Sequence, residues 1–344
     1  MLKNYGATIR ASFVGYVVQA MVNLFAPLLF VTFQNQYGIP LTQITALITV
    51  NFSLQLCVDL FSAVLVERIG YRVSVILAHT FAALGMIGLT LLPEVFPTPF
   101  SGLLCAVVLY AVGGGLLEVI ISPIVEACPN EHKARTMSVL HSFYCWGSVG
   151  VIVLSTLYFR LFGIENWKYM ALIWALLPIT NGIIFSQVPL RTLIPEGERK
   201  LSIPELLRTK LFWIFAVVIL CAGAAEQAVS QWASAFTEKG LGISKSMSDL
   251  VGPTLFSVFM GLSRMLYGRC LERIRLQHMM LGSTILCIIS YLMIGLSPYP
   301  ALSLAGIMLA GFSVGILWPG TYSQASEAIP AGRGGGGGPG RRRG

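Results

Sequence analysis

Charged residues are scarce in this chain of 344 residues. Aspartate, glutamate, lysine and arginine together make up 11% of the sequence, whereas hydrophobic residues make up 55% and the mean hydropathy is +0.75. Ordinary soluble domains carry about 25% charged residues. The shortage of charge excludes a typical soluble protein and predicts a membrane protein.

Motifs for cofactor and metal chemistry are also missing from the sequence. The seven cysteines form no CxxC pair, which gives no support for a zinc site or a disulfide framework. No Walker A loop, no HExxH motif and no GxGxxG following a predicted strand occurs. We therefore expect no cofactor, no metal and no enzymatic activity.

Apolar stretches of the length needed to cross a bilayer, about 20 residues, recur along the chain. They predict an all-α membrane protein with ten transmembrane helices, at 8–33, 41–65, 73–92, 100–127, 137–159, 168–188, 211–236, 249–270, 277–297 and 301–329.

The formal charge of +8 does not indicate a nucleic-acid partner, because the positions of the basic residues follow a membrane topology. Most of the 23 lysines and arginines precede the first span or follow even-numbered spans. By the positive-inside rule, this asymmetry predicts a multi-pass protein of the cytoplasmic membrane with both termini in the cytoplasm.

The chain divides into two related halves. The longest hydrophilic stretch between spans, 188–210, follows the sixth span, while VERIGYR (66–72) and EACP (126–129) recur as LERIR (271–275) and EAIP (327–330). We therefore expect two parallel repeats of six helices, of which the second is incomplete. The predicted divisions are a first bundle (1–188), a cytoplasmic linker (189–210), a second bundle (211–330) and a glycine- and arginine-rich tail (331–344).

One loop carries a family resemblance. AVLVERIGYR (63–72) resembles the G-x-x-x-D-R-x-G-R-R signature of the major facilitator superfamily, with Glu67, Arg68 and Arg72 in register, and GRCLERIRL (268–276) resembles a second copy, with Glu272 and Arg273. The resemblance implies a transporter of 12 helices, so we expect the eleventh and twelfth to be missing after residue 330. It also implies that these charged side chains fasten and release the cytoplasmic helix ends.

Four stretches resemble one branch of that superfamily, the fucose/galactose/glucose–proton symporters: VNLFAP (22–27), GGGLLEVIISP (113–123), SVLHSFYCWGSVG (138–150) and GFSVGILWPGTYS (311–323). This resemblance implies a monomeric symport permease for a small sugar-like solute. Where the branch has an aspartate, this chain has Asn23, which cannot carry a proton. Proton or sodium coupling therefore stays open at this point.

Glu118 is the main candidate for coupling. It lies roughly 13 Å from the end of its span, near mid-membrane, where an ionisable side chain usually faces a cavity or a partner. Such a carboxylate can accept hydrogen bonds from solute hydroxyls and can take up a proton when desolvated. The alternative is a buried acid paired with Arg264, the one basic residue inside a span.

Two charge pairs are predicted. Asp59 and Arg264 occupy matching positions in the two halves and would form a latch that depends on conformation, although local pairing of either residue is the alternative. At the cytoplasmic helix ends, Glu126 and its counterpart Glu327 are expected in structural ion pairs, Glu126 with Arg68 or Arg72.

Polar and aromatic residues suit a sugar, since hydroxyls need amide or carboxylate partners and an aromatic ring packs on the apolar face of a pyranose. The predicted solute-binding residues are Asn23, Glu118, Tyr144, Glu226, Gln227, Trp232, Trp318 and Tyr322. Trp232 can instead anchor its helix at the membrane interface, and His141 can be a gate, a proton carrier or a structural histidine. Transport of an organic anion or drug, and a truncated fragment that does not transport, are the alternative functions.

Overall fold

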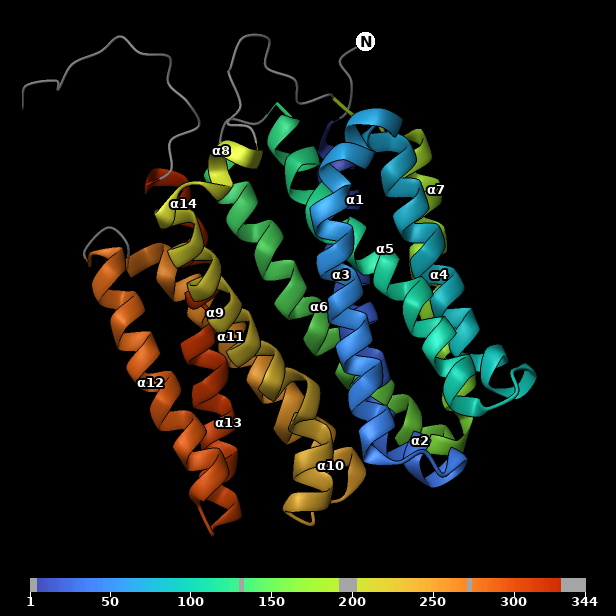
Figure 1. Cartoon of the computed structure of the whole chain (residues 1–344). Helices are drawn as coiled ribbons and strands as arrows, with labels where there is room; N and C mark the ends of the chain where they lie inside the picture. Colours follow the sequence, from blue (N-terminus) through green and yellow to red (C-terminus); the bar gives the residue numbers. More distant parts are fainter. Residues whose placement is uncertain (1–4, 130–132, 192–202, 271–273, 329–344) are drawn as a thin grey trace, which may run out of the picture.

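The computed structural model describes residues 5–129, 133–191, 203–270 and 274–328, and over these ranges the chain is helical and contains no strand (Figure 1). The predicted linker and tail lie largely outside the described residues. The ten predicted transmembrane helices are confirmed as ten described helical stretches long and apolar enough to span a membrane.

The first half consists of long helices joined by short turns. They are α1 (Tyr5–Leu28), α2 (Phe30–Tyr37), α3 (Leu41–Ile69), α4 (Tyr71–Val95), α5 (Pro99–Ala127), α6 (Lys133–Phe162), a short 3₁₀ turn (Ile164–Asn166) and α7 (Trp167–Gln187).

The second half begins with the short α8 (Ile203–Leu207), and two π-helical turns lie in the connection between its first two long helices. The elements are α9 (Lys210–Ala235), η2 (Phe236–Gly240), α10 (Lys245–Asp249), η3 (Leu250–Thr254), α11 (Leu255–Cys270), α12 (Leu276–Leu296), α13 (Pro300–Val314) and α14 (Leu317–Ala328).

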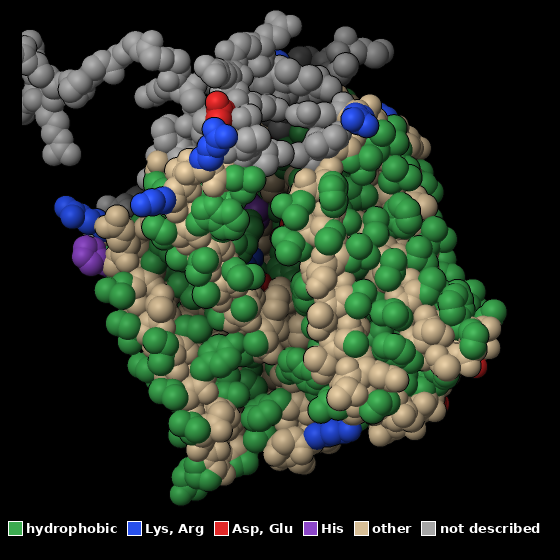
Figure 2. Space-filling model, viewed as in Figure 1, with side chains coloured by type: hydrophobic (Ala, Val, Ile, Leu, Met, Phe, Trp, Pro, Cys, Tyr) green, Lys and Arg blue, Asp and Glu red, His purple; other side chains and the backbone are tan. Residues whose placement is uncertain are grey.

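Apolar side chains cover the middle of the surface, and lysines and arginines gather toward the two ends (Figure 2). On α3, Leu60 and Phe61 are 66% and 70% exposed. Large apolar side chains exposed to this extent on long helices suit contact with lipid rather than water.

Two spans differ from the predicted single helices, and proline explains both. The first span is interrupted at Leu29, just after Pro27, and the tenth at Gly315 and Ile316, just before Pro319. Proline has no N–H, and its ring clashes with the carbonyl four residues earlier. Each interruption leaves one backbone carbonyl available to another partner.

Glycine sets the spacing of the best-packed helices of the first half. A Cβ atom placed on Gly85 of α4 would lie 2.5 Å from the backbone nitrogen of Tyr110 on α5, so no larger residue fits there without moving a helix. Close approach of these helices gives the first half a buried core.

The two halves meet along α1 and α6 on one side and α9, α10 and α11 on the other. We call the two ends of this interface the α8 end and the α10 end, after the helices at the top and bottom of Figure 1. Both α1 and α9 run from the α8 end toward the α10 end, whereas α3, α5 and α11 run the opposite way.

Candidate functional site

A cavity of about 930 Å³ separates the two halves. Its lining extends from Asn23 and Gln227, in the C-terminal parts of α1 and α9, to Glu126 and Met137, close to the α8 end. Figure 2 shows it as a cleft between the halves. This volume suits a small solute.

Four helices of the first half, α1, α3, α5 and α6, and three of the second, α9, α11 and α14, supply its walls. The polar lining residues are Tyr16, Gln19, Asn23, Gln55, Asp59, Glu118, Ser122, Glu126, His141, Tyr144, Glu226, Gln227, Arg264 and Trp318. The structure therefore brings together six of the eight predicted solute-binding residues.

Amide side chains hold the polar residues of the first-half wall in place through hydrogen bonds. Gln19 Nε2 donates to Glu118 Oε2 at 3.1 Å, so the carboxylate predicted to carry the proton has a partner of fixed position. Gln55 Nε2 donates to Asn23 Oδ1 at 2.9 Å and to Asn51 Oδ1 at 3.0 Å. The sequence did not indicate Gln19 as a partner of Glu118, because the two residues are 99 positions apart.

On the wall formed by the second half, the one basic side chain is paired with an acidic one. Arg264 on α11 lies with Nη2 3.4 Å from Glu226 Oε2 on α9, and Glu226 is 8% exposed. The same guanidinium donates from Nη1 to the carbonyl of His141 on α6 at 3.4 Å. Arg264 therefore connects both halves through the backbone of α6.

The two prolines that interrupt helices each serve this site. The carbonyl four residues before Pro319 belongs to Gly315, and it accepts from Arg264 Nε at 3.2 Å. The carbonyl four residues before Pro27 belongs to Asn23, and it accepts from Gln231 Nε2 of the other half at 3.0 Å. A proline inside an apolar span frees the carbonyl four residues earlier, and this is the sequence signal that could have found both acceptors.

Contacts between the halves close the α10 end. Besides the Gln231 bond, the rings of Phe30 and Trp232 lie 5.7 Å apart between centroids, and Lys239 Nζ donates to Gln34 Oε1 at 2.6 Å. Trp232 does not line the cavity in this conformation, and its role in solute binding stays a prediction. It packs below the cavity because α9 continues past Gln227 toward the α10 end.

Asp249 is the centre of a second closing network that sequence reasoning missed. Its side chain is fully buried and accepts from Lys245 Nζ at 2.7 Å, from Ser234 Oγ, and from Thr156 Oγ1 of α6 at 3.4 Å. The Lys245 and Asp249 spacing of four gave a local signal, but nothing in the sequence indicated Thr156.

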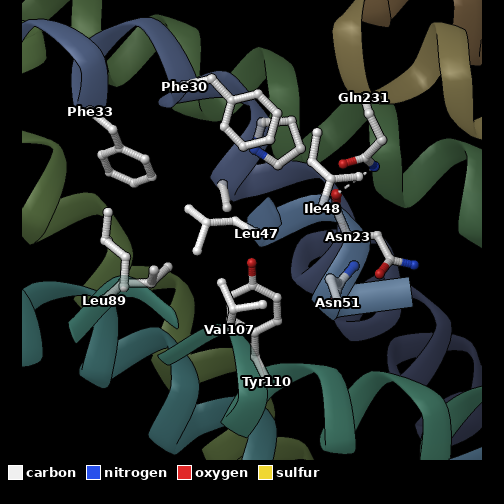
Figure 3. Close-up of a pocket in the computed structure, with 13 residues that line it drawn as sticks. Asn23, Phe30, Phe33, Leu47, Ile48, Asn51, Leu89, Val107, Tyr110 and Gln231 are labelled. Atoms are coloured by element: carbon white, nitrogen blue, oxygen red, sulfur yellow. Dashed lines mark hydrogen bonds between the residues drawn. The ribbon is translucent and has the colours of Figure 1, made fainter. Parts of the chain in front are cut away.

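A second cavity lies within the first half, where only Gln231 of the second half reaches it, and its volume of about 10 Å³ is room for one water molecule. Figure 3 shows Tyr110, Asn51 and Asn23 near its polar side, with Phe30 and Phe33 opposite. Its size excludes it as a solute site.

The predicted Asp59–Arg264 latch is not formed in this conformation, because Arg264 is paired with Glu226. Asp59 lines the cavity, and its Oδ1 is buried with no hydrogen-bond partner among the described residues. A pairing in another conformation stays a prediction.

Arg72 differs from its predicted role beside Glu126. Its guanidinium donates to the carbonyls of Phe185, Ser186 and Val188 at 2.6–2.9 Å, which satisfies the C-terminal carbonyls of α7. Glu126 lines the mouth of the cavity and is exposed. A pairing of Glu126 with the exposed Arg68 stays a prediction.

Five further predicted residues cannot be placed. The side chains of Glu67, Tyr322 and Glu327, and both Glu272 and Arg273, lie outside the described part of the structure.

The stretch GFSVG (311–315) has the G-x-S-x-G spacing of a hydrolase nucleophile but not its setting. Ser313 is fully buried within α13, and its hydroxyl donates to the carbonyl of Ala310 at 2.8 Å. The hydrolase motif requires an exposed serine at a strand-to-helix turn.

Comparison with known proteins gives one family and several similar folds. The family model described as Major Facilitator Superfamily matches residues 11–338. None of the curated protein sequences compared with the chain matches it.

Three solved structures share the fold at low sequence identity. A D-xylose–proton symporter is 13% identical with a TM-score of 0.70, over 95% of this chain and 83% of that one. A bacterial homologue of the human lysosomal transporter Spinster, inward-facing and occupied, is 14% identical with a TM-score of 0.68, over 96% and 76%. The transporter FucP in the outward conformation is 13% identical with a TM-score of 0.65, over 92% and 84%.

Proposed function

Because this chain belongs to the major facilitator superfamily, we propose that it is a secondary transporter that moves a small hydroxylated, sugar-like solute by alternating access, coupled to a proton. The observation that carries the proposal is the cavity of about 930 Å³, which lies between the halves and combines amides, carboxylates and aromatic rings. Hydroxyl groups of a solute can donate to the carboxylates and accept from the amides.

The two ends of the interface support alternating access. The cavity reaches toward the α8 end, while the halves are in contact at the α10 end. Breaking the contacts at one end while forming contacts at the other would expose the same lining to the opposite side of the membrane. We assign the α8 end to the cytoplasm, since the basic loops of the sequence lie there.

The aromatic lining favours a solute with an apolar ring face. Trp318 and His141 lie 6.5 Å apart between ring centroids, and Tyr16 packs edge-on against His141 at 5.4 Å. One structure of the same fold is that of a D-xylose–proton symporter, so the fold is compatible with this class of solute.

An organic anion is the weaker candidate. Arg264, the basic residue on which that alternative depended, has its charge paired with Glu226. An anionic solute would have to displace this carboxylate and approach the other acidic residues of the lining.

Proton coupling is assigned to Glu118. It faces the cavity, and its described hydrogen-bond partner is the neutral amide of Gln19, so no basic group holds it in the ionised form. Such a carboxylate can bind a proton while the cavity is open to one side of the membrane and release it when the cavity opens to the other side.

The test uses purified protein in liposomes and a panel of labelled sugars, with and without a proton gradient. Glu118→Gln is expected to abolish accumulation driven by the gradient while exchange of labelled for unlabelled solute continues, because exchange needs binding but no net proton release. Glu94→Gln is the matched control, since Glu94 is exposed and pairs with Lys168 far from the cavity. Unchanged accumulation by Glu118→Gln would refute the coupling role, and no uptake of any sugar by the unmodified protein would refute the proposed function.

A further inference from the structure

The charges that line the cavity do not balance. Its described lining contains four carboxylates, those of Asp59, Glu118, Glu126 and Glu226, against the single guanidinium of Arg264. Arg264 is engaged by Glu226, and Glu126 is exposed at the mouth, where water can reach it. The unbalanced acids deep in the cavity are therefore Asp59 and Glu118.

These two acids lie at the same depth on neighbouring helices. A Cβ atom on Gly115 of α5 would lie 3.2 Å from the Cα atom of Gln55 on α3, so these helices approach closely there. Asp59 follows that contact by four residues and Glu118 by three, which is about one turn of each helix. Because α3 and α5 run in the same direction, the two carboxylates lie one turn nearer the α8 end, on the same wall.

The surroundings of the two carboxylates differ. Glu118 receives a hydrogen bond from Gln19, whereas Oδ1 of Asp59 is buried and has no hydrogen-bond donor among the described residues. A buried carboxylate oxygen is rarely left without a donor or a cation, since the desolvation of the charge is then not compensated. What Asp59 lacks in the protein can be supplied by whatever occupies the cavity.

We propose that the transported solute carries a protonated amine as well as hydroxyl groups, and that Asp59 is its counter-ion. This inference rests on the proposed function, because it assigns a charge to the solute of the same cavity. An ammonium group offers three hydrogen-bond donors and one positive charge, which can pair with the carboxylate of Asp59 in the cavity lining and reduce the charge imbalance. Amino sugars and amino polyols have this chemistry.

The separation of roles between the two acids follows from their partners. Glu118, held by a neutral amide, exchanges a proton, and Asp59 binds the cationic group of the solute. Arg264, on the opposite wall, is kept from repelling the amine because Glu226 neutralises it. Asp59 is thus a specificity-determining residue.

The test compares glucosamine, N-acetylglucosamine and glucose, which share a pyranose ring but of which only glucosamine is cationic. Binding to the purified full chain, and competition with labelled uptake in liposomes, are measured for each. We expect glucosamine to bind at least tenfold more tightly than the two neutral sugars. In Asp59→Asn this preference should disappear, while the neutral sugars bind within about twofold of their original affinity.

Two controls keep the outcome decisive. Asp59→Glu retains the charge and is expected to retain a reduced preference for the amine, and Glu94→Gln removes an exposed carboxylate outside the cavity and should change nothing. Equal or tighter binding of the neutral sugars by the unmodified protein would overturn the inference while leaving the proposed function standing. An amine preference that survives in Asp59→Asn would overturn it as well, and failure of all three sugars to bind would overturn both.

Discussion

The two ends of the interface between the halves are built from different groups. At the α8 end the walls carry charged side chains and are separated by the cavity. At the α10 end the halves meet through an amide bonded to a backbone carbonyl, an aromatic pair and the buried Asp249 network. Charges that must gain and lose partners lie where water can enter, whereas the buried closing contacts of Gln231 and Asp249 satisfy one another without water. Closure of the α10 end therefore depends on a few contacts that can be removed one at a time.

Asp249→Ala is expected to have the largest effect. It removes a fully buried carboxylate and leaves Lys245, whose side chain is 21% exposed, with the neutral hydroxyl of Ser234 at 3.0 Å and the more distant carboxylate of Glu238 at 3.9 Å. Loss of one partner of a buried ion pair costs about 3 kcal/mol of unfolding free energy. Thermal melting of the purified protein in detergent measures the loss.

Glu94→Ala provides the control for that measurement. Glu94 pairs with Lys168 at 2.6 Å, but its side chain is 54% exposed, so water screens the pair and a much smaller loss of unfolding free energy than in Asp249→Ala is expected. Similar losses for the two variants would show that the Asp249 network contributes no more than a surface ion pair.

Gln231→Leu is expected to open the α10 end without unfolding the protein. The change leaves the carbonyl of Asn23 without its donor from the other half, and an unsatisfied buried group costs about 1–3 kcal/mol. The population of molecules open at the α10 end should rise by at least about fivefold. Spin labels at Asn35 and Ser244, in a cysteine-free background, report this opening as a longer distance.

The matched control is Gln187→Leu, since Gln187 is exposed at the end of α7. An unchanged distance distribution in Gln231→Leu would show that this bond does not hold the α10 end closed.

Pro27→Ala should act on the same bond with a smaller effect. Alanine restores an N–H at residue 27 that can donate to the Asn23 carbonyl and so compete with Gln231. The carbonyl keeps a partner, so opening should increase less than in Gln231→Leu. In the double variant the two effects should not add, because both act on one acceptor; additive shifts between the same spin labels would refute the competition.

Hydropathy alone predicted the ten spans, because an apolar segment of sufficient length has few alternatives in a bilayer. Glu118, Glu226 and Arg264 could be recognised for a related reason, since an ionisable residue inside a span is costly and needs a partner or a cavity. The split of the tenth span was missed because hydropathy does not respond to Pro319, although the proline was in the sequence.

Partners across helices could not be predicted in the same way. Whether Gln19 contacts Glu118, or Thr156 contacts Asp249, depends on the rotation of each helix about its axis. That rotation is set by packing, such as the approach of α4 to α5 at Gly85, and not by composition. Trp232 shows the consequence: its position along the span was known, but a shift of about one turn decides between the cavity and the closed region below it.

Lys239→Met is expected to have the smallest effect, and it tests whether an exposed contact between the halves matters as much as a buried one. Lys239 donates to Gln34 at 2.6 Å between the halves, as Gln231 does to Asn23, but both Lys239 and its contact are exposed. Water can replace an exposed hydrogen bond, so the loss should be about 0.5 kcal/mol or less. The spin-label distance should then stay within the error of the unmodified protein. A shift as large as that of Gln231→Leu would mean that an exposed contact holds the α10 end closed as well as a buried one does. The two ends would then differ in the number of bonds between the halves, and not in how well those bonds are shielded from water.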